Sequence, residues 1–265
     1  MSLILSNIGY ATASVAMSAA VGSITGGRTV TAFGERESMG TTATGEDIWR
    51  GNELSPAPTS HLVIPTPAEA GEQMTVVSES TNDTAAGTGV QTVSIHYLDA
   101  AGDEQDEIVT LNGTTPVNTV ATDIRFVNDF HAQTVGTGGV AADNIKIYKT
   151  GSVGLVYNMI AAGGNKSLVP HRMVPRGKML VITSWHAGEA QSKRVNVRIR
   201  STDMYDELLP GVFCFKDTTF LNGTTTGNIT LNTPIPALSV VKISGWPDAI
   251  GAEVGCSWAG VLLTE

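Results

Sequence analysis

The chain has 265 residues, of which 42% are hydrophobic and 15% charged, and this composition excludes a disordered protein. Its net charge of −9 argues against a nucleic-acid partner, because neutralising phosphates requires a basic surface. The two cysteines, Cys214 and Cys256, exclude a disulfide framework, and both are expected as buried free thiols.

Residues 1–60 are rich in Gly, Ala, Ser and Thr and contain one strand-like run, 28–33. So little apolar surface does not offset the entropy lost on ordering. We therefore expect an extended N-terminal arm with one short strand, ordered where it lies on another subunit or domain. A floppy terminus is the alternative. No apolar run reaches the roughly 18 residues of a membrane span, so no membrane partner is expected.

From residue 61 onward, apolar residues alternate with polar ones, as in half-buried strands. Glycine-containing turns at 98-LDAAGDE-104 and 111-LNGTT-115 predict antiparallel hairpins. The same pattern continues to the C-terminus. We expect an all-β protein with two antiparallel β-sandwich, jelly-roll-like domains at 61–160 and 161–265, after the arm at 1–60.

Motifs for catalysis, cofactors and metals are not found. The five histidines are never closer than 15 positions, so each is expected at the surface or satisfied in the core, without a metal. The segment 255-GCSWAG-260 resembles a nucleophile elbow but has no later Asp and His. The acidic run 103-DEQDE-107 lacks the ligand spacing of a calcium loop and is expected as a solvated hairpin tip. We therefore predict no enzyme activity, no catalytic residue and no cofactor.

Charge is unevenly distributed along the chain. Residues 1–150 hold 17 acidic and 6 basic side chains, net −11, whereas residues 151–265 hold 8 acidic and 10 basic, net +2. Arg194, Arg198 and Arg200 alternate with apolar residues and form one basic face of an expected strand. We interpret this face as a contact with an acidic subunit or domain, and a solvated strand face is the alternative.

Trp49 and Arg50 are a second candidate contact. They join a large aromatic side chain and a guanidinium in an arm otherwise made of small residues. This pair is typical of interface anchors, whereas simple packing of the arm on its own domain is the alternative.

The order of several motifs resembles a family of structural proteins of tailed bacteriophages. The motifs are 29-TVTAFG-34, 46-EDIWRG-51, 80-STNDTAAGTGVQTVSIHYLDAAGDEQDEIVTLNGTTPV-117 and 135-VGTGGVAADNIKI-147. The resemblance covers most of residues 28–150 and is looser in the C-terminal half. It implies a virion protein without enzyme activity, in a symmetric assembly on the head or tail.

The leading hypothesis is an oligomeric capsid decoration or cement protein in the virion, a homotrimer whose other partners are virion proteins such as the major capsid protein or tail components. A tail or fibre-attachment protein is the alternative. A different class is a carbohydrate-binding module that contacts the host surface, suggested by Trp185, Trp246 and Trp258, because sugars stack on aromatic rings. Three core tryptophans are the simpler interpretation of the same residues.

Overall fold

The computed structural model describes residues 26–41, 45–50, 70–154, 156–202, 213–226 and 229–264. They form sixteen strands in four sheets, with no helix in this part of the chain. Every pairing between the strands is antiparallel. The expected all-β, antiparallel class is confirmed. Accordingly, no helix capable of crossing a membrane occurs among these residues.

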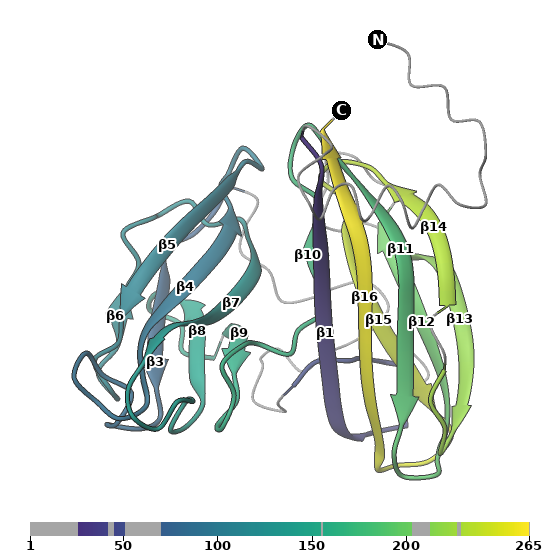
Figure 1. Ribbon diagram of the computed structural model, residues 1–265, viewed down its shortest axis with the longest axis horizontal. Helices are drawn as coiled ribbons and strands as arrows, with labels where there is room; N and C mark the ends of the chain where they lie inside the picture. Colours follow the sequence, from purple (N-terminus) through teal and green to yellow (C-terminus); the bar gives the residue numbers. More distant parts are fainter. Residues whose placement is uncertain are drawn as a thin grey trace.

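Two sheets form what we call the first unit (Figure 1). One has the order β6-β3-β8-β9 and the other the order β5-β4-β7. The strands are β3 (Met74–Ser78), β4 (Val90–Leu98), β5 (Glu104–Thr110), β6 (Val117–Asn118), β7 (Phe126–Val135), β8 (Ile145–Lys149) and β9 (Val156–Ile160). Apolar side chains of both sheets meet in one buried cluster, which includes Val76, Ile95, Phe130 and Ile147.

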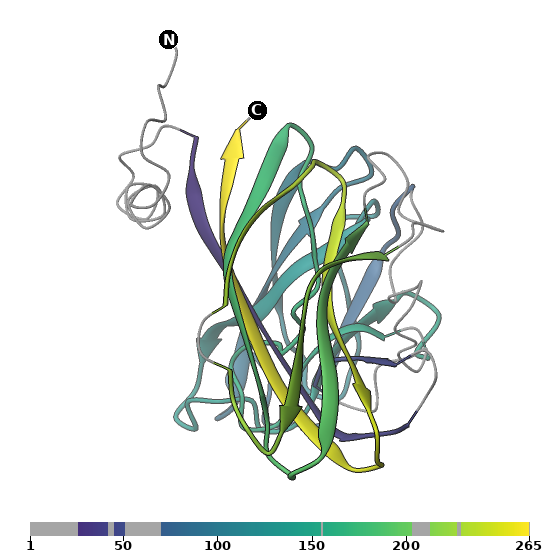
Figure 2. The same ribbon diagram turned by 90° about the vertical axis from the view of Figure 1, so that its right-hand side faces the viewer.

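The remaining strands form the second unit, beside the first in Figure 1 and in front of it in Figure 2. Its sheets have the orders β1-β16-β11-β14 and β10-β15-β12-β13, and β2 also pairs with β15. The strands are β1 (Arg28–Met39), β2 (Glu46–Asp47), β10 (Arg172–Met173), β11 (Lys178–Glu189), β12 (Arg194–Thr202), β13 (Phe213–Asn222), β14 (Ile229–Ile235), β15 (Val240–Pro247) and β16 (Ala252–Thr264). Their inward side chains share a second buried cluster.

The segment expected as an arm differs from that expectation over residues 28–50. Instead of one short strand, β1 runs for 12 residues along β16, from Arg28 opposite Leu262 to Met39 opposite Ala252. Val30, Ala32 and Met39 reach the core of the second unit, so backbone pairing and burial offset the ordering entropy. The second unit is thus completed by residues far from 161–265 in sequence. Residues 1–25, 42–44 and 51–60 of the expected arm lie outside the described residues.

The predicted glycine turns are confirmed. Gly102 closes the β4–β5 hairpin with φ of 87°, and its N–H donates to the Asp99 carbonyl oxygen at 2.8 Å. Gly113, in the 111–115 turn, has φ of 61°. Both conformations lie in the left-handed region, where a side chain is strained. The Gly102 turn fixes the register of β4 and β5, and hence which side chains share a sheet face. The Gly113 turn leads from β5 to β6, which lie in different sheets, so the antiparallel hairpin expected there does not form.

Candidate functional site

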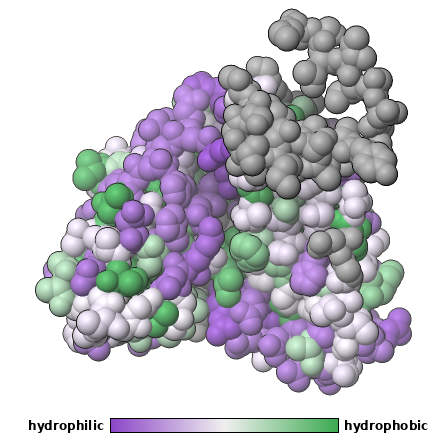
Figure 3. All heavy atoms as spheres, viewed as in Figure 1, coloured by the Kyte–Doolittle hydropathy of each residue, from purple (hydrophilic) through white to green (hydrophobic). Residues whose placement is uncertain are grey.

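A cleft of about 390 Å³ lies between the two units. One wall is the outer face of β4, β5 and β7, and the other is formed by the start of β1 and by Arg172 of β10. Figure 3 shows hydrophilic atoms gathered over the first unit on the side that faces the second. This cleft is the polar site that the sequence did not reveal.

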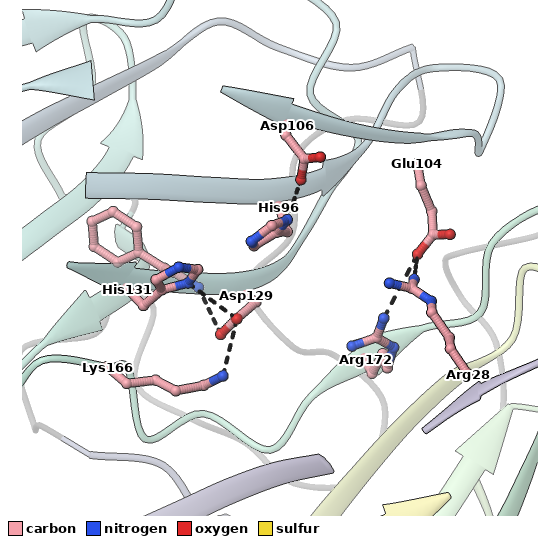
Figure 4. Close-up of polar contacts among 9 residues, drawn as sticks. Arg28, His96, Glu104, Asp106, Asp129, His131, Lys166 and Arg172 are labelled. Atoms are coloured by element: carbon pink, nitrogen blue, oxygen red, sulfur yellow. Dashed lines mark hydrogen bonds and ion pairs between the residues drawn. The ribbon is translucent and has the colours of Figure 1, made fainter. Parts of the chain in front are cut away.

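The cleft is spanned by ion pairs from the acidic segment 103–107. Glu104 contacts the Arg28 guanidinium and lies 3.8 Å from Nη2 of Arg172 (Figure 4). Asp103 also contacts Arg176. The sequence predicted a solvated hairpin tip at 103–107, but these ion pairs show that the segment also contacts the second unit. The charge asymmetry does correspond to an acidic–basic contact between the two parts of the chain, but other arginines than the predicted ones make it.

Register places four ionisable side chains on the cleft face of the first unit. His96 of β4 lies opposite Asp106 of β5 and opposite Asp129 of β7. His131 lies two residues beyond Asp129, on the same face. The two imidazole rings are stacked, with centroids 5.2 Å apart, and Lys166 donates to Asp129 at 2.9 Å. Two imidazoles and two carboxylates in one place can hold a cation. The rest of the cleft is lined by both basic and acidic side chains, among them Arg28, Arg172 and Glu104.

The predicted basic face of Arg194, Arg198 and Arg200 is divided among three environments. Arg194 is exposed and lies 3.6 Å from Asp248. Arg198 stacks on Phe215 and Trp246, with its guanidinium carbon 4.4 and 4.1 Å from the ring centroids. Arg200 is only 2% exposed, so it is not part of an open basic surface. The pairing of β12 with β13 shifts between Ile199 and Arg200, which the alternating pattern could not indicate.

Arg200 belongs to a buried charge cluster centred on Asp47 of β2. Asp47 accepts hydrogen bonds from Lys242 at 3.1 Å and Ser244 at 2.7 Å, and Arg200 lies 3.6 Å from it. Asp47 and Lys242 are fully buried. Burial lowers the pKa of Lys242 to about 8 although Asp47 opposes the shift, and it lowers the pKa of Arg200 to about 10. These contacts fasten residues 45–50 to the second unit.

Trp49 and Arg50 do lie at a contact, but it is one within the chain. Trp49 is fully buried and packs against Tyr148, Val156 and Met159 of the first unit. Arg50 lies 3.1 Å from Glu35 and 2.6 Å from Glu37, both on β1. Trp49 therefore joins the two units.

His171 lies between Trp49 and the charge cluster. Its ring centroid is 5.2 Å from that of Trp49, and neither ring nitrogen has a hydrogen-bond partner among the described residues. Burial lowers the pKa of His171 to about 4, with Lys242 and Arg200 adding to the shift and Asp47 opposing it. The neutral ring is therefore the form that the fold accommodates.

This burial predicts a loss of stability in mild acid. Between pH 6.5 and 4 the unfolded chain protonates His171 and the folded chain does not, so the free energy of unfolding falls by about 3 kcal/mol as the pH is lowered through this window. Urea unfolding at several pH values measures it. In His171→Leu, which removes the titrating group, the fall over this window should nearly vanish. An identical fall in both proteins would assign the acid sensitivity to other groups.

Some of the tryptophans and cysteines singled out in the sequence are buried, and others are at least partly exposed. Trp185 and Trp258 are each 1% exposed and lie opposite each other on β11 and β16, so they are core residues and not a sugar platform. Trp246 is partly exposed, beneath Arg198. Cys256 is buried as expected, whereas Cys214 is exposed on β13.

Comparisons with known proteins leave the family open. No protein-family profile and no curated protein matches the chain. Among solved structures, a structure of infectious bursal disease virus, Gt strain, aligns over 90% of this chain and 72% of its own, with 10% identity and a TM-score of 0.21. T=1 particles derived from the same virus align over 91% and 74%, with 9% identity and a TM-score of 0.17. Similarity at this level does not establish a shared fold.

Proposed function

We propose that this chain is a non-enzymatic structural subunit of a tailed-phage virion, which decorates the capsid as a homo-oligomer. Each sheet pair would act as a β-sandwich, jelly-roll-like module in that particle, with the trimer as the expected assembly. The motifs within residues 28–150 that resemble phage structural proteins support the proposal. The strongest structural support is an exposed aromatic surface on the second unit.

This aromatic surface lies on the outer face of β12, β13 and β15. Phe215 and Phe220 of β13 are 57% and 72% exposed. Phe220 lies opposite Asn196, and Asn196 lies opposite Trp246, so these side chains share one face with Arg198. Exposed aromatic residues with arginine are the composition of protein–protein contacts.

The position of β13 adds to this support. β13 is the last strand in the described order of its sheet, and no other described strand pairs with its outer edge, which is the kind of edge that another chain can extend. Phe215 and Phe220 lie on β13, two strands away from β15 and its partners β2 and β10. Phe213 of the same strand belongs to an apolar contact with the first unit, but Phe215 and Phe220 do not. A neighbouring copy or a capsid subunit can therefore dock there without disturbing the chain's own fold.

Substitution at this surface tests the proposal. Phe220→Ser should shift the sedimentation-equilibrium mass from an oligomer toward the monomer, because it removes exposed apolar area from the contact. The free energy of unfolding should change by no more than about 0.5 kcal/mol, as is usual for substitutions at exposed positions. Ile250→Ser, at a position 73% exposed that lies outside this surface, is the control and should leave the mass unchanged. A wild-type chain that sediments as a monomer, or an unchanged Phe220→Ser oligomer, contradicts this role of the surface.

A tail or fibre-attachment protein would use the same surface. The location of the chain in the particle, on the capsid or on the tail, distinguishes these two roles. The carbohydrate-binding alternative loses two of its three tryptophans to the core.

A further inference from the structure

The cleft face of the first unit brings together the ligands of a metal site. One ligand atom each from His96, Asp129 and His131 can be chosen so that all lie within 4.8 Å of one another. His96 and Asp129 are direct cross-strand partners, and His131 follows Asp129 by two residues on β7. The arrangement is therefore fixed by strand register on a rigid sheet.

We propose that His96, His131 and Asp129 bind a divalent transition-metal ion of the zinc type. Two imidazoles and one carboxylate are ligands typical of zinc, at about 2.0–2.2 Å, and three protein ligands leave one position for water. Calcium and magnesium favour all-oxygen sets. This inference is independent of the proposed role in a virion.

The surroundings of the two histidines prepare them for this role. Asp106 contacts Nδ1 of His96 and so leaves Nε2 for the ion, which is the carboxylate–histidine–metal arrangement. Nδ1 of His131 is buried, lies 3.2 Å from Oδ2 of Asp129, and makes no hydrogen bond among the described residues. The backbone N–H of Phe130 donates to Oδ1 of Asp129 at 3.1 Å and orients the carboxylate.

Binding requires two adjustments that the cleft permits. The stacked rings, now 20° from parallel, must turn so that one nitrogen of each points to a common centre (Figure 4). Lys166 must also leave Asp129, because its ammonium group occupies the oxygen that the ion needs. The Lys166 side chain is 44% exposed and lines the cleft, so it can move into solvent. Lys166 is therefore a built-in competitor of the metal.

Calorimetric titration of the untagged, chelator-treated full chain with Zn²⁺ tests the site. We expect one ion per chain, at least tenfold weaker binding in His96→Ala and in His131→Ala, and unchanged binding in His186→Ala, a histidine of β11 outside this site. Ca²⁺ should not bind with comparable affinity. Lys166→Ala should bind Zn²⁺ several-fold more tightly, because the competing ammonium is gone.

If a histidine variant fails to fold, the Zn²⁺ affinity of Lys166→Ala still tests the site, because this variant keeps all three proposed ligands. Zn²⁺ should also raise the melting temperature of the wild-type chain, and more so in Lys166→Ala. Absence of Zn²⁺ binding to the wild-type chain would overturn the proposal. Binding that is as strong in His96→Ala and His131→Ala, or weaker in Lys166→Ala, would place the ion elsewhere and overturn it equally.

Discussion

Asp47→Ala should lower the free energy of unfolding by about 3–5 kcal/mol, the loss typical of removing one partner of a buried ion pair. Arg200 would keep its charge in a buried site, Lys242 would lose the carboxylate that opposes the lowering of its pKa by burial, and the Ser244 hydroxyl would lose its acceptor. The change also removes the side-chain contacts between β2 and β15, because Asp47 is one of the two residues of β2. Urea unfolding at pH 7 measures the loss.

Asp248→Ala is the matched control. Its carboxylate lies 3.6 Å from Arg194 with both side chains exposed, so its loss should change stability by less than about 1 kcal/mol. In Asp47→Asn one carboxylate oxygen becomes an NH2 group, which can donate to the Ser244 hydroxyl while the amide oxygen still accepts from Lys242. Lys242 loses its counter-charge, so an intermediate loss is expected. Equal stability of Asp47→Ala and the wild type would show that the buried charges need no partner in the folded chain.

Trp49→Ala should lower the free energy of unfolding by about 3–5 kcal/mol and loosen the contact between the two units. The indole fills a fully buried space among Tyr148, Val156 and Met159, and the chain cannot collapse into that space without moving one unit against the other. Chemical unfolding measures the cost, and small-angle scattering measures the spread of distances between the units.

Trp49→Phe keeps most of the apolar volume and should cost less than half as much. Its scattering profile should match that of the wild-type chain. If Trp49→Ala unfolds like the wild type and scatters identically, the units are held together by the second apolar contact, in which Leu98 and Phe126 meet Met173 and Phe213.

The alternation of apolar residues predicted most strands, because it reflects which face of a strand is buried. β12 is an example in which the alternation correctly predicts burial. Its Val195, Val197 and Ile199 are buried, as their spacing indicates. β1 was underestimated because its partner, β16, lies more than 200 residues later, and the energy that orders β1 comes from that pairing. Local composition contains no record of such a partner.

The candidate sites depend even more on distant pairing. His96 and His131 are 35 positions apart, and only the register of β4 on β7 places them on one face. No turn joins β4 directly to β7, so the local turn signals could not indicate this register. From the unequal charge of the two halves we expected Arg194, Arg198 and Arg200 at an acidic–basic contact, whereas Arg172 and Arg176 are the arginines that lie near acidic residues of the first unit. Which arginines do so depends on how the units pack.

The position of the chain in purified particles tests the virion proposal most directly. Phage particles should be separated into complete virions and capsid shells that lack tails, then analysed by mass spectrometry and cryo-electron microscopy. We expect the chain on the tail-less shells, in density repeated at symmetric capsid positions. That density should accommodate both units and contact its neighbours through the surface with Phe215 and Phe220. A chain absent from both kinds of particle, or found only on tails, would contradict a capsid decoration protein.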